Sequence, residues 1–183
     1  LFLGDMLVTE KDDTMIEERL ADAGIAERLG LRHVVLSAPD NRPFDPAAVA
    51  EALAAHPDLA FVALVHCETT SGLLNPAEAI ADLCHKTGRA LLIDAMSAFG
   101  ALPCDAGRLG FAALAASSNK CLQGVPGLGF VLCRKEKLSP KGHTCQSIVL
   151  DLAAQDRQFS ADGQWRFTPP THVVAALAEA LDE

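Results

Sequence analysis

Asp94 and Lys120 combine reactive side chains with settings in which such groups do chemistry. Asp94 ends the apolar run 90–93, so we expect its carboxylate to be partly buried and to need a cationic or hydrogen-bonding partner. Lys120 follows the apolar run 112–116 and precedes a glycine- and proline-rich turn at 123–127, which indicates a cleft rather than a flat surface.

A lysine and a buried aspartate at the ends of neighbouring strands suit pyridoxal chemistry. The amine can form a Schiff base with an aldehyde cofactor while the carboxylate keeps the pyridine nitrogen protonated. Three other interpretations stay open from the residues alone. Asp94 could cap the next helix or turn, and Lys120 could be an ordinary solvated lysine. A nucleotide-hydrolysing core would need a G-x-x-x-x-G-K-[ST] loop, and the sequence has none.

The elements that position these two residues alternate between strand and helix. Apolar runs at 33–37, 60–66, 90–94, 111–116 and 128–133 predict strands. Helices are predicted at 14–29, at 46–56 and from Pro76 to a stop at Gly88, with further helices at 144–155 and 172–181 around a loop at 160–170. This order predicts an α/β fold of three layers, α/β/α, with a mostly parallel sheet whose ligands gather at the carboxyl ends of the strands.

Composition narrows the class of protein. The chain of 183 residues has a formal net charge of -9. Such a surface argues against nucleic acid or an anionic membrane as partner and favours a small-molecule substrate. The six cysteines form no C-x-x-C pair, which indicates a reducing, cytoplasmic setting, and no Cys/His spacing predicts a metal site.

Four segments resemble one family, the 2-aminoethylphosphonate:pyruvate transaminases. They are HCETTSG (66–72), DAMSAFG (94–100), SNKCLQGVPG (118–127) and GQWRFTPPTH (163–172). The resemblance implies the large domain of a pyridoxal-phosphate enzyme with the aspartate aminotransferase-like fold. It also implies transfer of the amino group of 2-aminoethylphosphonate to pyruvate, giving phosphonoacetaldehyde and L-alanine.

The same resemblance assigns roles to individual residues. Lys120 would carry the cofactor, pyridoxal 5'-phosphate, and Asp94 would pair with its pyridinium nitrogen. Thr69 would lie near the ring oxygen, although it could equally serve as a turn residue. Asn119 would lie near the cofactor phosphate or stabilise its own turn, and Thr168 would reach the phosphate in the neighbouring subunit of a homodimer.

Thr171 is the second choice for that threonine, because the alignment of the loop leaves both open. Arg166 is left without a role.

The resemblance also sets out what the chain is expected to lack. The residues before Phe61 contain no cluster that would grip the phosphate and no stacking aromatic residue, and a small C-terminal domain would lie beyond Glu183. The chain is therefore expected to be part of a large domain. Alternative functions are an alanine:glyoxylate or serine:pyruvate aminotransferase, which would share the lysine and the aspartate, or an inactive fragment.

Overall fold

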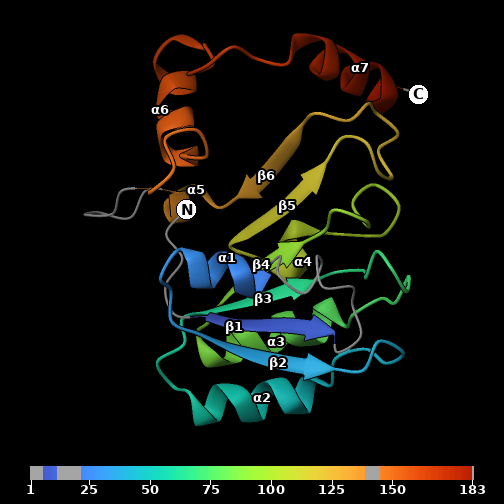
Figure 1. Cartoon of the computed structure of the whole chain (residues 1–183), viewed down its shortest axis with the longest axis vertical. Coiled ribbons are helices and arrows are strands. Elements are labelled where there is room, and N and C mark those ends of the chain that lie inside the picture. The colour runs from blue at the N-terminus through green and yellow to red at the C-terminus, as the bar shows by residue number, and fades with distance from the viewer. Residues whose placement is uncertain (1–5, 12–21, 139–144, 183) are drawn as a thin grey trace.

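Six strands form one sheet in the order β2-β1-β3-β4-β5-β6 in the computed structural model, which describes residues 6–11, 22–138 and 145–182 (Figure 1). The strands are β1 (Met6–Lys11), β2 (His33–Ala38), β3 (Phe61–Val65), β4 (Ala90–Asp94), β5 (Ala113–Ser117) and β6 (Gly129–Cys133). The helices are α1 (Asp22–Arg28), α2 (Pro46–Ala55), α3 (Ala77–Thr87), α4 (Ala106–Leu109), α5 (Lys135–Leu138), α6 (Leu152–Asp162) and α7 (Thr171–Asp182).

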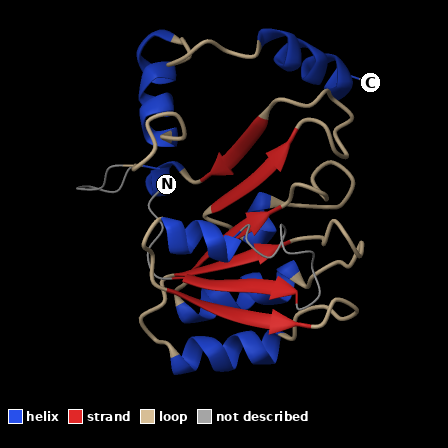
Figure 2. Cartoon of the chain, in the orientation of Figure 1, coloured by secondary structure: helices blue, strands red, loops and turns tan. Residues whose placement is uncertain are grey.

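Strands β1 to β5 run parallel, and β6 pairs with β5 in the antiparallel direction. Helices lie on both faces of the sheet (Figure 2). The predicted three-layer α/β/α architecture with a mostly parallel sheet is therefore confirmed. Because parallel neighbours end at the same edge, the segments that follow β3, β4 and β5 lie close together there.

The two faces of the sheet bury different sets of side chains, because successive residues of a strand point to opposite faces. On one face Met6 and Val8 of β1 pack with Ala26 of α1. On the other face the larger core cluster contains Leu64 of β3, whose register partner in β4 is Ile93. Helices α2 and α3 supply the opposing side chains of this second layer, among them Val49, Leu53, Ile80 and Cys84.

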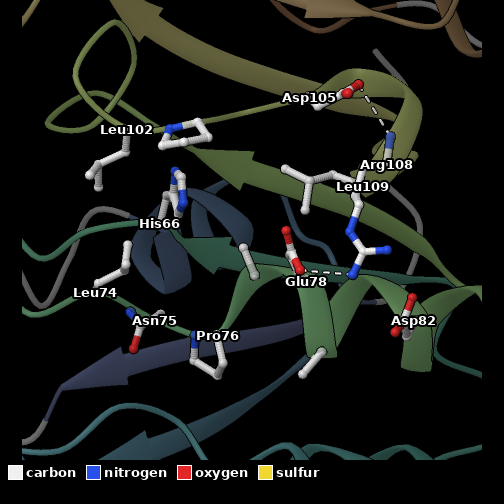
Figure 3. Close-up of a pocket in the computed structure, with 13 residues that line it drawn as sticks. His66, Leu74, Asn75, Pro76, Glu78, Asp82, Leu102, Asp105, Arg108 and Leu109 are labelled. Carbon is white, nitrogen blue, oxygen red and sulfur yellow. Dashed lines mark hydrogen bonds and ion pairs between the residues drawn. The ribbon is translucent and has the colours of Figure 1, made fainter.

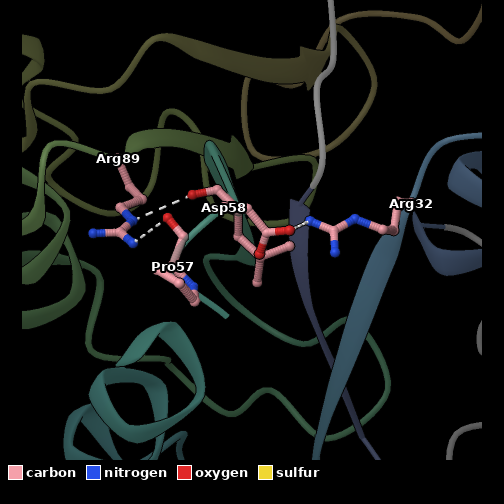
Figure 4. Close-up of polar contacts among 5 residues, drawn as sticks. Arg32, Pro57, Asp58 and Arg89 are labelled. Carbon is pink, nitrogen blue, oxygen red and sulfur yellow. Dashed lines mark hydrogen bonds and ion pairs between the residues drawn. The ribbon is translucent and has the colours of Figure 1, made fainter. Parts of the chain in front are cut away.

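The amino-terminal edge of the sheet is held by Arg89, the residue before β4. Its guanidinium donates hydrogen bonds to the carbonyl oxygens of Leu59 (3.2 Å), Pro57 (2.9 Å) and Thr87 (2.6 Å). Figure 4 shows this cluster beside the ion pair between Arg32 and Asp58. These contacts fasten the starts of β3 and β4 to each other.

The five predicted strands, the helices at 46–56 and 76–88 and the last helix at 172–181, which is α7, are confirmed. Helix α3 begins after Pro76 and ends at Gly88, whose φ of 69° is the left-handed conformation expected of a glycine cap. The sequence analysis missed β1 and the short helices α4 and α5. It also placed a helix at 144–155 that is wrong: α6 begins only after Asp151, whose carboxylate accepts a hydrogen bond from the Ala154 N–H, and ends at Asp162, before the Gly163 cap.

Residues 14–21 of the first predicted helix, and Thr144, lie outside the described residues. Residues 145–182, which carry α6 and α7, form a C-terminal arm beyond β6 (Figure 1). Neither of its helices contains a buried residue. Within the described ranges, no helix is long and apolar enough to span a bilayer.

Candidate functional site

Asp94 is the last residue of β4 and is half-buried, as the sequence predicted. Its Oδ1 accepts a hydrogen bond of 2.8 Å from the Met96 N–H, and its backbone carbonyl accepts one of 2.7 Å from the His66 N–H. In the register of the sheet, Asp94 pairs with Val65 of β3 and Ala115 of β5. Its carboxylate therefore lies at the carboxyl edge of the central strands, on the face that α1 covers.

Lys120 lies in the loop that follows β5 and is exposed. The described residues do not close over it, so the cleft expected from the sequence is not formed by this part of the chain alone. The loop itself is well anchored through Ser118, which has no exposed surface. Its hydroxyl donates to the carbonyl of Val125 at 2.6 Å, and its own carbonyl accepts from the Gly124 N–H at 2.8 Å.

Gly124 allows this loop to fold tightly. A Cβ atom added there would lie 2.9 Å from the Ser118 carbonyl oxygen and 3.5 Å from the Cα of Leu177 in α7. Both contacts are with backbone or near-backbone atoms that cannot rotate away. The contact with the Ser118 carbonyl oxygen therefore requires a glycine in the turn after Lys120, whereas the contact with α7 is of ordinary length.

Thr69 lies in the turn after β3 and is exposed. This turn is closed by backbone hydrogen bonds of 2.9 Å from the Glu68 N–H to the Leu73 carbonyl and from the Gly72 N–H to the Glu68 carbonyl. The buried Asn75 supports it from behind, because its amide donates to a Glu68 carboxylate oxygen at 2.6 Å and to the Val65 carbonyl at 2.9 Å. The hydroxyl of Thr69 is thus presented from a fixed turn.

Ser97 joins the three segments at this edge, and sequence reasoning gave it no role. Its hydroxyl donates to the carbonyl of Cys67 after β3, while its own carbonyl accepts from the thiol of Cys121 after β5 at 3.3 Å. The loop after Asp94 is therefore bonded to the segments that carry Thr69 and Lys120. Its position inside the second quoted motif was the only signal available, and spacing alone could not reveal its partners.

The remaining predicted residues are placed less centrally. Asn119 is exposed beside Lys120. Thr168 is exposed in the segment between α6 and α7, and within the described chain no hydrogen bond or ion pair joins it to the sheet edge. Nearby Arg166 donates to the Ile148 carbonyl at 2.9 Å and stacks on Phe167, which gives it a structural role in the C-terminal arm.

No group of three or more histidine, cysteine or acidic residues that could hold a metal ion occurs among the described residues. All six cysteines are free thiols. The thiol of Cys84 is buried under α3, and this burial raises its pKa to about 11, so it stays protonated at neutral pH. The sheet edge therefore carries the Asp94 carboxylate and the Lys120 amine together with several hydroxyls.

Comparison with known proteins gives this arrangement a family. The aminotransferase class-V family matches residues 17–182. The chain is 49% identical over 161 residues to 2-aminoethylphosphonate–pyruvate transaminase of Pseudomonas aeruginosa, covering 88% of this chain and 43% of that protein. It is 48% identical over 159 residues to the protein of the same name from Burkholderia ambifaria, covering 87% and 43%.

Solved structures share the fold over the whole chain. Alanine–glyoxylate aminotransferase from Nostoc sp. superimposes with a TM-score of 0.85 at 28% identity, covering 100% of this chain and 48% of that one. Pyridoxamine–pyruvate aminotransferase from Mesorhizobium loti gives a TM-score of 0.81 at 26% identity, covering 100% and 47%. This chain spans less than half the length of these relatives. On the family match and the shared fold, the chain belongs to the class-V aminotransferases.

Proposed function

We propose that this chain is the cofactor-holding part of an enzyme that moves the amino group of 2-aminoethylphosphonate to pyruvate, giving phosphonoacetaldehyde and L-alanine. The observation that carries the proposal is the link through Ser97, which ties the loop after Asp94 to the segment that carries Lys120. The names of the relatives at 48% to 50% identity support this choice of substrates.

The residues present fit pyridoxal phosphate in two respects. Asp94 offers a half-buried carboxylate whose Oδ1 accepts a hydrogen bond from the Met96 N–H, and Lys120 offers an accessible amine in the loop after the neighbouring strand. When bound, the cofactor supplies the aldehyde that takes up an amino group and a ring that accepts electron density. Thr69 and Asn119 would contact the ring oxygen and the phosphate, and Thr168 would contact the phosphate from the second subunit of a homodimer.

In this proposal Lys120 first holds the cofactor and then acts as a base. Once substrate had taken its place, the free Nζ of Lys120 would take up the proton that leaves the substrate carbon and would later give it up again, acting as general base and then general acid. Asp94 does not transfer protons. Its carboxylate, oriented by the hydrogen bond from the Met96 N–H, would pair with the ring nitrogen of the bound cofactor, keep that nitrogen protonated and so stabilise charge that develops in the transition state.

The test adds pyridoxal phosphate to the protein that carries this sequence and records the visible absorption band and the transfer of amino groups to pyruvate. Lys120→Ala should abolish both, whereas Lys135→Ala, the loss of an exposed lysine on α5, should leave both unchanged. Retention of the band and of transamination by Lys120→Ala would show the assignment of Lys120 to be wrong.

An alanine:glyoxylate or serine:pyruvate aminotransferase is the second candidate, favoured by the TM-score of 0.85 to the Nostoc enzyme. A screen of amine donors separates the two. Activity with L-serine or L-alanine and none with 2-aminoethylphosphonate would favour the second candidate. Equilibrium dialysis of the 183-residue chain with pyridoxal phosphate tests the inactive-fragment alternative, because tight binding at one molecule per site would count against it.

The proposal also includes the cellular location of the protein. The wide spacing of its cysteines, all of them free thiols, supports a reducing cytoplasmic location.

A further inference from the structure

The turn that carries Lys120 has a backbone conformation that its own residues do not favour. Gln123 has a φ of 59°, in the left-handed region that residues other than glycine rarely adopt. Its N–H donates to the Lys120 carbonyl at 3.0 Å and so closes the turn. A residue in this conformation persists where surrounding contacts hold it, so the turn depends on its anchors.

Two kinds of contact anchor this turn. The hydrogen bonds of Ser118 stay within its own loop, because they join it to Gly124, Val125 and Leu128. They fix the shape of the loop. The second kind of contact reaches the segment that follows β4, and it decides where the loop lies relative to that strand.

Cys121 makes the polar contact of this second kind. Its half-buried thiol donates to the Ser97 carbonyl at 3.3 Å. An apolar contact lies close by, because a Cβ atom added at Gly100 would be 2.7 Å from Cδ2 of Leu122 and 3.5 Å from the carbonyl carbon of Cys121. The two loops therefore meet at two points, one polar and one apolar.

Ser97 is held from its other side by the segment after β3. Its hydroxyl donates to the Cys67 carbonyl, and Cys67 forms an isolated β-bridge with Leu74. The Asn75 N–H donates to the His66 carbonyl at 2.9 Å, which ties the two ends of this segment together. Figure 3 shows His66, Leu74 and Asn75 beside a pocket of about 610 Å³ on the face of the sheet that α3 covers. The Ser97 carbonyl is thus a fixed acceptor for the thiol.

We propose that Cys121 is a positioning residue for Lys120. Its thiol, docked on the Ser97 carbonyl, sets the place of the Lys120 amine relative to the Asp94 carboxylate, so that both meet one bound cofactor. The inference rests on the proposed function, which gives the two side chains a cofactor to share. Cys121 itself touches no reacting atom. A misplacement of about 1 Å in a reacting group can lower a rate about a hundredfold, so a modest contact has a large effect here.

The test compares the protein that carries this sequence with three variants. Cys121→Ala removes the donor, whereas Cys121→Ser keeps a hydrogen-bond donor at the same point. Cys133→Ala is the matched control, because Cys133 is a half-buried cysteine of β6 outside the two loops. Thermal unfolding of each variant checks that the fold is intact.

The first measurement needs no turnover. Pyridoxal phosphate is added to the cofactor-free protein, where the Lys120 amine condenses with its aldehyde and releases water. Borohydride added at timed intervals reduces the new C=N bond, and peptide mass spectrometry then counts the label on each lysine. We expect Cys121→Ala to label Lys120 about tenfold more slowly, and Cys121→Ser and Cys133→Ala to stay within about twofold of the unchanged protein. The exposed Lys135 should be labelled equally in all four proteins.

The second measurement is steady-state transamination with 2-aminoethylphosphonate and pyruvate. Cys121→Ala should lower kcat about tenfold and leave KM nearly unchanged, because the variant moves a reacting amine and removes no group that binds substrate. Cys121→Ser should restore kcat to within about twofold of the unchanged protein.

Equal labelling of Lys120 in Cys121→Ala and in the unchanged protein would overturn the proposal, and so would an equal loss in Cys121→Ala and Cys121→Ser. If Cys121→Ala does not fold, Ser97→Ala takes its place, because it releases the acceptor from the Cys67 carbonyl; unchanged labelling would again overturn the proposal. Absence of label from Lys120 in the unchanged protein would contradict the proposed function, and the positioning role with it.

Discussion

The centre of the sheet and the C-terminal arm differ in how far their apolar side chains are exposed to solvent. In the centre, Leu64, Ile80 and Leu114 have no exposed surface. In the arm, Ile148, Val149 and Leu150 are each 70% to 73% exposed. The part of the chain that carries Asp94 and Lys120 therefore supplies its own core, whereas the part that carries Thr168 does not.

That difference has a consequence for the candidate site. The loops at the carboxyl edge of the sheet are held in place by contacts within this chain, such as the hydrogen bonds of Ser97 and Asn75. Trp165 and Phe159 of the arm meet edge to face, with ring centroids 5.4 Å apart, and both stay exposed. The role proposed for Thr168 accordingly needs a surface that the described ranges of this chain do not provide.

The largest expected effect is on stability, from a matched pair of leucines. Leu64→Ala should lower the free energy of unfolding by about 3 kcal/mol, because it removes a fully buried side chain and leaves a cavity. Leu181→Ala in α7, where the leucine is 61% exposed, should change it by less than about 0.5 kcal/mol. Urea unfolding measures both, and equal losses would contradict the contrast between the two regions.

A matched pair of hydrogen-bonding side chains should show a smaller difference. Asn75→Ala removes the bonds to the Val65 carbonyl, the Glu68 carboxylate and the Phe44 N–H, and should cost about 2 kcal/mol. Gln158→Ala removes an exposed bond to Asp162 in α6 and should cost less than about 0.5 kcal/mol. Thermal unfolding would refute the comparison if the two variants were equally stable.

The smallest expected effect is a dependence of folding stability on pH that comes from the centre of the sheet and not from the C-terminal arm. Burial lowers the pKa of His66 in the folded chain below its ordinary value of 6.5, so the unfolded chain binds the proton more readily. The contribution of the neutral His66 ring to the free energy of unfolding is present in full above pH 6.5. It declines as the pH falls from 6.5 toward the lowered pKa of the folded chain. His66→Gln should remove this part of the decline.

His172→Gln, in the exposed arm, is the matched removal of a histidine. Unfolding measured in urea across the acid range gives the two slopes. A decline that is the same in His66→Gln as in the unchanged protein would show that His66 does not contribute to it.

The sequence predicted the central elements well because their signals are local. Pro76 and Gly88 bound α3 through fixed φ angles, and the unbroken apolar runs mark strands buried on both faces. It failed where the local signal was weak or where two starting points for a helix were similarly favoured. The strand β1 follows the first few residues of the chain without a turn signal, and Asp151 as a cap was overlooked in favour of an earlier helix start.

Residue types and spacing alone determined the candidates Asp94 and Lys120, since each terminates or follows an apolar run and each belongs to a quoted motif. Only the tertiary structure decided that Ser97 bonds the segments around them, that Lys120 stays exposed, and that His66 faces a pocket on the other side of the sheet. Local preferences act over a few residues. Sheet order and the partners of a buried side chain depend on contacts between segments far apart in the chain, and no local pattern encodes them.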